Sequence, residues 1–137
     1  MMTNNGLVSV ESRFGVTETI DRLVETITRT GLRVFARIDH AAGAHEIGAP
    51  LRPTELLIFG HPKSGTLLMQ DKQTAGIDLP IKALAWEDEQ GKVWLSYNDA
   101  HWLAERHGLG DASRDAVAAI AAGLKKVVAA AAGVDQS

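Results

Sequence analysis

The segment FGHPKSGT, residues 59–66, has the glycine spacing of a phosphate-binding loop and follows an apolar run that predicts a strand. A nucleotide-binding loop of this kind places a lysine and a hydroxyl side chain directly after its second glycine. The lysine neutralises phosphate charge and the hydroxyl holds magnesium. Thr66 and Leu67 occupy those two positions here, so nucleotide hydrolysis is disfavoured. The segment is interpreted as a strand-to-helix turn, with a helix start that attracts anions. Its candidate ligand-binding residues are His61, Lys63, Ser64 and Gly65.

A carboxylate and an imidazole are neighbours at Asp39 and His40, where a predicted strand ends. Such a pair can orient the imidazole for proton transfer or metal binding. The step from His40 to His45 differs from the i, i+4 spacing that places two metal ligands on one helical face, so no metal site is predicted. Two interpretations stay open. Asp39 and His40 either belong to a ligand-binding or acid–base site, or Asp39 caps a short helix and His40 packs locally.

A third group of polar residues follows the last predicted strand, where His101 and Glu105 are one helical turn apart and His107 comes soon after. That spacing suits a shared metal or an ion pair. Trp102 and Leu103 are expected to anchor this helix and to leave the charged residues in solvent. Only a distant partner brought close by folding would change that interpretation. The sequence has no serine in a G-x-S-x-G turn and no dinucleotide-binding fingerprint.

Composition excludes several classes of function. The chain has 137 residues, 45% of them hydrophobic and 23% charged, which predicts one globular domain over residues 1–137. Its ordered core is expected at about 7–132, between short flexible termini. The absence of cysteine excludes disulfides, thiolate catalysis and cysteine-held metals, and the net charge of -3 disfavours nucleic-acid binding. No apolar run approaches the roughly 20 residues of a membrane span, and the first residues do not read as a signal peptide. A cytoplasmic protein without a cofactor or a membrane partner is therefore expected.

Hydrophobic periodicity predicts the elements that position these residues. Strands are predicted at residues 7–14, 32–39, 54–59, 81–87 and 92–98, and helices at about 17–30, 99–107 and 112–132, with short helices after Asp39 and after His61. A run of strands backed by two main helices indicates the α+β class. We expect a two-layer, largely antiparallel sheet of about five strands with both main helices on one face.

Aromatic residues are concentrated in the predicted sheet. The hairpin of the last two strands places Trp86 opposite Trp94 and Ala83 opposite Tyr97. If the helices cover the other face, the exposed face is an apolar surface with a basic rim, which usually marks an interface. A homodimer contact is the favoured interpretation, and a small-ligand or peptide surface and a simple covering of the sheet are the alternatives. The residues assigned to this face are Phe35, Trp86 and Trp94, with Arg33, Arg37, Lys82 and Lys92 around them.

Four separated segments together resemble the domain-of-unknown-function family numbered 302. They are VFARIDHAAGA at 34–44, LIFGHPKSGT at 57–66, AGIDLP at 75–80, and VWLSYN at 93–98 with LAERH at 103–107. The resemblance implies a two-layer fold similar to the TATA-binding-protein-like arrangement, with strand, helix, four strands and helix in order, and it implies dimers. It supplies no catalytic residue, because none is established for the family. The family often has Asn where this chain has His61, so a mechanism that depends on His61 would be particular to this protein.

Three hypotheses for function follow. The leading one is a small-molecule or anion-binding module in a homodimeric cytoplasmic protein. The alternatives are an enzyme of general acid–base type that uses Asp39 and His40, and a structural protein-interaction domain. Convergence of Asp39, His40 and His61 on one pocket would favour a ligand site or an enzyme, whereas their separation would favour the interaction domain.

Overall fold

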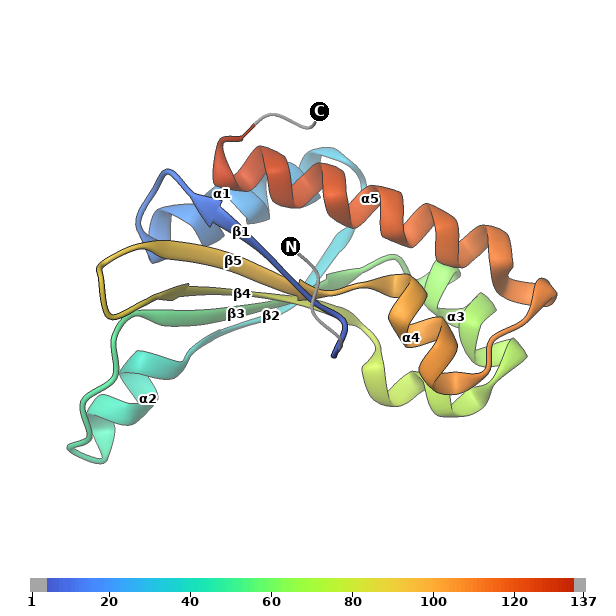
Figure 1. Cartoon of the computed structure of the whole chain (residues 1–137), viewed down its shortest axis with the longest axis horizontal. Coiled ribbons are helices and arrows are strands. Elements are labelled where there is room, and N and C mark those ends of the chain that lie inside the picture. The colour runs from blue at the N-terminus through green and yellow to red at the C-terminus, as the bar shows by residue number, and fades with distance from the viewer. Residues whose placement is uncertain (1–4, 135–137) are drawn as a thin grey trace.

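The computed structural model describes residues 5–134, which form an α+β fold built on one five-stranded antiparallel sheet in the order β1-β5-β4-β3-β2. Of the termini predicted to be flexible, outside about 7–132, residues 1–4 and 135–137 lie outside the described range. Figure 1 shows α1 and α5 together on one face of the sheet, with α2 projecting from one end and α3 and α4 gathered at the other. The strands are β1 (Leu7–Ser12), β2 (Arg33–Asp39), β3 (Thr54–Gly60), β4 (Ile81–Glu87) and β5 (Val93–Asn98); the helices are α1 (Val16–Arg29), α2 (His40–Glu46), α3 (Pro62–Asp71), α4 (Ala100–His107) and α5 (Arg114–Ala132), with short 3-10 helices η1 (Gln73–Asp78) and η2 (Asp111–Ser113).

The main core lies between the sheet and the α1–α5 layer. Ile20, Leu23 and Ile27 are fully buried because their spacing places them on one side of α1, against the sheet and α5. Arg22 ties the two helices together, since its guanidinium donates to the carbonyls of Ala130 and Ala131 at 3.0 Å each. The predicted two-layer arrangement, with both main helices on one face, is confirmed.

The β4–β5 hairpin has the predicted register. Trp86 pairs with Trp94 and Ala83 pairs with Tyr97. The two indoles stack with their centroids 6.4 Å apart. Asp88 in the connecting turn accepts hydrogen bonds from the Trp94 indole and from the Lys92 amide, both at 2.9 Å, which ties the turn to the strand.

A β-bulge between Val34 and Ala36 changes the alternation along β2. Beyond the bulge, Arg37 pairs with buried Leu57 on the helix-facing side. The Arg37 guanidinium donates to Asp21 of α1 at 2.7 Å and to buried Glu55 at 2.9 Å. This cluster shifts the pKa of Arg37: burial lowers it, but the bonds and charges of the two carboxylates outweigh burial, so the net pKa is raised.

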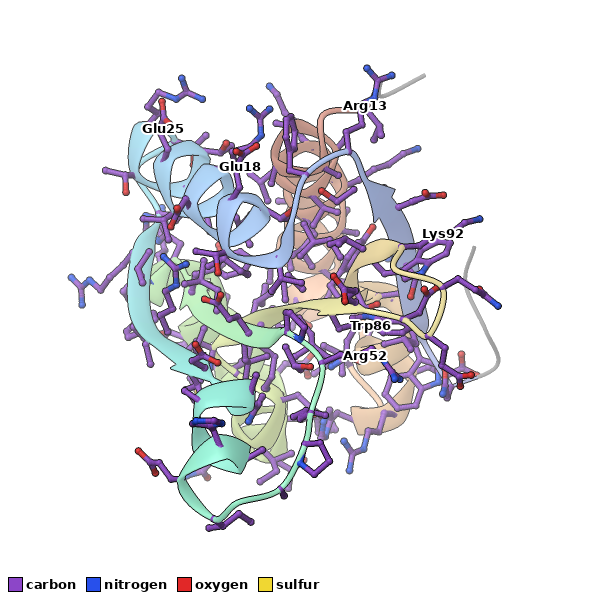
Figure 2. The ribbon with its side chains drawn as sticks, turned by 90° about the vertical axis from the view of Figure 1, so that its left-hand side faces the viewer. Arg13, Glu18, Glu25, Arg52, Trp86 and Lys92 are labelled. Carbon is purple, nitrogen blue, oxygen red and sulfur yellow. The ribbon has the colours of Figure 1, made fainter. Side chains whose placement is uncertain are left out.

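The prediction that Phe35 and Arg37 share a sheet face with Trp86 and Trp94 is therefore wrong. The bulge inserts one residue without a partner, so strict alternation from Leu32 fails at Phe35. Trp86 does lie on the side of the sheet away from α1, as Figure 2 shows.

Candidate functional site

A cavity of about 350 Å³ lies at the end of the sheet where α3 approaches α5. We call it the α3–α5 cavity. Its innermost wall is the margin of the main core, formed by buried Phe59, Leu124 and Val127. Phe35, which is 46% exposed, borders it from β2. The full lining is Leu32, Phe35, Phe59, Gly60, His61, Pro62, Ser64, Gly65, Thr66, Met69, Leu79, Pro80, Ile81, Ala119, Ile120, Gly123, Leu124 and Val127.

The amino end of α3 supplies the polar part of this lining. Pro62 occupies the first helical position, where its missing N–H removes no hydrogen bond. His61 is the N-cap, and its Nδ1 accepts a hydrogen bond from the Lys63 amide at 3.1 Å. A ring nitrogen that accepts a hydrogen bond carries no proton. The hydrogen of a neutral His61 ring is therefore assigned to Nε2, which becomes a donor.

The cavity lining contains no aspartate, glutamate, lysine or arginine. Of the predicted ligand-binding residues, His61, Ser64 and Gly65 line the cavity, and exposed Lys63 does not. Thr66, which stands at the lysine position of a phosphate-binding loop, also belongs to the lining. The region predicted from the glycine loop thus borders a hollow that is apolar in its walls and uncharged except for the titratable ring of His61.

Asp39 and His40 lie at the other end of the β2–β3 pair. Arg33 at the start of β2 pairs with Gly60, whereas Asp39 pairs with Glu55. Six strand residues at about 3.4 Å each separate the two ends by roughly 20 Å. Asp39 caps α2 by accepting from the Ala42 amide at 2.9 Å, and exposed His40 begins that helix. Asp39 and His40 therefore do not converge with His61 on one pocket.

Folding brings a distant partner to His107 at the cavity end of the molecule. The Nε2 atom of His107 lies 2.6 Å from a carboxylate oxygen of Asp78, and its Nδ1 lies 3.2 Å from the Thr74 hydroxyl. Arg106 donates to both oxygens of Asp78 at 3.1 and 3.0 Å. The His107 side chain is only 8% exposed, so the prediction that it is solvated is wrong. No local pattern signals this cluster, because Asp78 and His107 belong to different elements.

A second carboxylate at this end joins α3 to the start of α5. Asp71 accepts hydrogen bonds from the Ser113 hydroxyl at 2.7 Å and from the Gly110 amide at 2.9 Å. The bond from the Ser113 hydroxyl is the main cause, followed by that from the Gly110 amide, and together they hold the pKa of Asp71 below its ordinary value. Polar contacts of Asp71 and Asp78, which lie outside the lining, thus hold the elements at this end of the molecule in place.

Across residues 5–134, no three histidine, aspartate or glutamate side chains gather as a metal-binding set. None of the helices in this range is long and apolar enough to cross a membrane.

Known proteins resemble this chain over most of its length. "Fluoride-specific ion channel FluC 1" of Brucella suis biovar 1 (strain 1330) is 56% identical over 130 residues, which are 95% of this chain and 51% of the relative. "Fluoride-specific ion channel FluC 2" of Brucella melitensis biotype 1 shows the same identity over 48% of its length. The chain therefore spans about half the length of the curated relatives it matches.

A solved structure and a family assignment agree with the fold. The crystal structure of the uncharacterized conserved protein DUF302 from Bacillus stearothermophilus superposes with a TM-score of 0.77 at 21% identity, covering 93% of this chain and 96% of that one. The family described as "Domain of unknown function DUF302" matches residues 8–131. This match covers most of the sequence and agrees with the resemblance of the four separated segments, so the chain belongs to the DUF302 family.

Proposed function

We propose that this chain is a small-molecule-binding domain whose ligand occupies the α3–α5 cavity. The cavity itself is the observation that carries the proposal. Its volume of about 350 Å³ falls within the range of roughly 300 to 1,000 Å³ that is typical of ligand pockets. The lining combines apolar walls with three polar residues, His61, Ser64 and Thr66, which is the usual composition of such a pocket.

The packing cost supports the same proposal. Protein interiors contain few voids larger than a water molecule, and apolar walls without neighbours lose dispersion contacts. The walls here come from five elements, β2, β3, β4, α3 and α5, and their side chains leave the space between them unfilled. A ligand that fills the space restores those contacts and stabilises the folded protein.

The separation of Asp39 and His40 from His61 weakens the acid–base hypothesis. Asp39 is engaged in capping α2, and the second hollow beside that helix is lined by Ala41, His45, Ala49, Pro50, Leu51 and Arg52 rather than by the pair. Within the α3–α5 cavity, His61 is the only titratable lining residue, so the cavity holds no acid–base pair. Because Asp39, His40 and His61 do not converge on one pocket, their placement favours an interaction domain. The ligand-binding proposal therefore depends on the cavity alone.

The name of the Brucella relatives does not supply the ligand. The 130 matched residues are about half of those proteins, and the DUF302 match accounts for residues 8–131 of this chain. No cationic side chain lines the α3–α5 cavity, which disfavours a small anion such as fluoride as its occupant. We therefore propose no channel activity for this chain.

A fragment screen by ¹H–¹⁵N correlation spectroscopy tests the proposal. Pools of neutral apolar compounds, carboxylates, nucleotides and sugars are added to the labelled protein, and binders are expected to shift the amides of Leu32, Gly65 and Ile120. The variant Gly65→Leu should abolish these shifts. A Cβ at Gly65 would lie 3.8 Å from Leu79 Cδ1, so the longer side chain extends among cavity residues without a backbone clash.

The matched control is Gly43→Leu, which adds the same side chain to exposed α2, where a Cβ meets nothing within 4 Å. This variant should keep the shifts. Binding that survives Gly65→Leu, or no saturable shift at the cavity from any pool at millimolar concentration, contradicts the proposal.

A homodimer through the uncovered sheet face is a second proposal. The stacked Trp86 and Trp94 lie on that face, and Ile38 of the edge strand β2, which lies on the same face, is 39% exposed. Trp and other aromatic residues are enriched in interfaces. Sedimentation at micromolar concentration should show a dimer that Ile38→Glu converts to monomer, and a monomer for the unaltered chain contradicts the dimer. A cytoplasmic location stays a prediction from the sequence.

A further inference from the structure

The structure also points to the class of ligand, an inference that rests on the proposed function. We infer that the α3–α5 cavity takes a neutral, mainly apolar molecule with one hydrogen-bond acceptor, such as a ketone, aldehyde or ester. This class differs from the small anion expected from the glycine loop. Size, charge, hydrogen bonding and access each bear on the inference.

The size of the cavity limits the apolar part of the ligand. An engineered cavity of about 150 Å³ in another protein, lined by Leu, Ile and Phe, holds one benzene. The α3–α5 cavity has about 350 Å³, a little more than twice that volume. A fused pair of aromatic rings with a short substituent, or an alkyl group of similar bulk, fits this space.

The charge of the lining excludes an ionised group from the interior. Moving a carboxylate or ammonium out of water is unfavourable unless an opposite charge or several hydrogen bonds replace the hydration. No lysine, arginine, aspartate or glutamate lines the cavity, and Lys63, the nearest cation along the loop, is exposed outside it. A neutral ligand loses no such hydration energy on entry.

The polar lining includes one assigned hydrogen-bond donor, the ring of His61. Nε2–H of His61 is a donor because Nδ1 accepts from the Lys63 amide. Ser64 and Thr66 are also lining residues. They are two positions apart in α3, so their side chains point to different sides of the helix, and His61 is the donor on which the inference depends. All three side chains come from the first turns of α3 and its cap. A carbonyl oxygen at this side of the cavity would therefore find a donor in His61, whereas a hydrocarbon would leave that donor to water.

Two helical glycines leave space in the wall of the cavity. Gly65 of α3 and Gly123 of α5 both line it. A Cβ at Gly123 would meet nothing within 4 Å. Glycine within a helix is unfavourable relative to alanine. At Gly123 it leaves the space that a side chain would otherwise occupy, beside Ile120 and Leu124 of the same lining.

Three naphthalenes of nearly equal size test the inference by isothermal titration. They are 2-acetylnaphthalene, which has a carbonyl acceptor, 2-ethylnaphthalene, which lacks it, and 2-naphthoate, which is charged. The ketone should bind about tenfold more tightly than the hydrocarbon, as expected for one hydrogen bond. The naphthoate should bind at least about a hundredfold more weakly than the ketone, because its charge has no partner in the lining.

Two substitutions at His61 separate its role as a hydrogen-bond donor from its role as the N-cap of α3. His61→Asn keeps an N-cap and an amide donor, whereas His61→Asp keeps the N-cap but presents an acceptor. Both variants should therefore fold with similar melting temperatures. His61→Asp should remove the tenfold preference for the ketone, and His61→Asn should retain part of it.

The outcomes distinguish the two proposals. Tighter binding of 2-naphthoate, or equal binding of ketone and hydrocarbon, overturns the inferred ligand class and leaves small-molecule binding intact. A preference for the ketone that is unchanged in His61→Asp overturns the role of His61 as donor. Failure of all three probes to bind, with no binder in the fragment screen, overturns the proposed function itself.

Discussion

The two ends of the β2–β3 pair differ in a way that explains where a ligand can bind. At the Gly60 end, the strands run into the α3–α5 cavity, and neighbouring carboxylates are fixed by partners from α4 and from the turn before α5. At the Asp39 end, the chain enters α2, a short helix with no buried residue. One end encloses space, and the other offers polar side chains to solvent.

Residues with reactive side chains and the enclosed space therefore lie at opposite ends of this strand pair. Asp39 and His40 have the chemistry of an acid–base pair, yet they lie where nothing excludes water. The enclosed end is lined mainly by aliphatic and aromatic side chains, which attract little notice in a search for catalytic patterns. A ligand site of this kind is defined by packing around a space, and its polar residues only orient the occupant.

Removal of Asp78 should have the largest effect on stability. Asp78→Ala breaks the contacts with Arg106 and leaves the His107 side chain, which is 8% exposed, without its carboxylate. Loss of charge-assisted hydrogen bonds around a buried partner should cost about 2 to 3 kcal/mol of unfolding free energy, after allowance for the exposure of Arg106. Urea unfolding followed by tryptophan fluorescence measures the change.

The matched control for that measurement is Asp111→Ala. Its partner is Arg114, and the two side chains are 88% and 74% exposed, so removal should change stability by no more than about 0.5 kcal/mol. Equal effects at Asp78 and Asp111 would show that the His107 cluster does not fix the cavity end.

Acid should weaken the Asp71 contact between α3 and α5. The Ser113 hydroxyl, followed by the Gly110 amide, lowers the pKa of Asp71 in the folded protein below the ordinary value of 3.8. A carboxyl group with a lower pKa in the folded state stabilises that state above the unfolded pKa. The contribution is lost as pH falls from about that value through the folded pKa.

Ser113→Ala should raise the pKa of Asp71 toward its ordinary value and reduce this acid sensitivity. Carboxyl ¹³C titration measures the shift. Asp88 provides an internal comparison, because its pKa is lowered chiefly by the Trp94 indole and should not respond to Ser113→Ala. An unchanged titration of Asp71 in the variant would contradict the proposed cause.

Much of the fold was predictable because it depends on local patterns. The spacing of Ile20, Leu23 and Ile27 predicted the buried face of α1, and the hairpin predicted the Trp86–Trp94 pair. β1 ends at Ser12, before the predicted Phe14, because the Ser12 hydroxyl accepts from the Phe14 amide and contacts Thr19 as the chain turns into α1.

The candidate site was predictable only in part. The glycine loop located His61, Ser64 and Gly65 beside the cavity, since helix starts after strands can be recognised from sequence. The bulge at Phe35 was not visible, because the alternation read from the sequence continues through β2 although the side-chain directions change at the bulge. The volume between α3 and α5 depends on how far apart the packed helices lie, and no spacing within one segment reports that distance.

Loss of the α2 cap should have a moderate and local effect. Asp39→Ala removes the acceptor for the Ala42 amide and should cost about 1 kcal/mol, mainly in the stability of α2. Asp39→Asn retains a capping oxygen and should restore most of it. Amide hydrogen exchange at Ala42 measures the change, and the affinity of 2-acetylnaphthalene should be unaltered. A loss of affinity in Asp39→Ala would show that the two ends of the β2–β3 pair are coupled and do not act independently.

The smallest expected effect is a gain in stability at Gly123→Ala. A Cβ at this helical position meets nothing within 4 Å, so alanine adds no clash. Alanine also restricts the unfolded chain and favours the helix, which together should stabilise the protein by about 0.5 to 1 kcal/mol. A single methyl occupies little of a 350 Å³ cavity, so the affinity for the ketone should fall by no more than about threefold. Thermal unfolding and titration of the same sample measure both quantities. A stabilised variant that still binds would show that glycine is not needed at this position for binding. A destabilised variant would show that the surroundings of Gly123 are more crowded than the distances to its Cβ indicate.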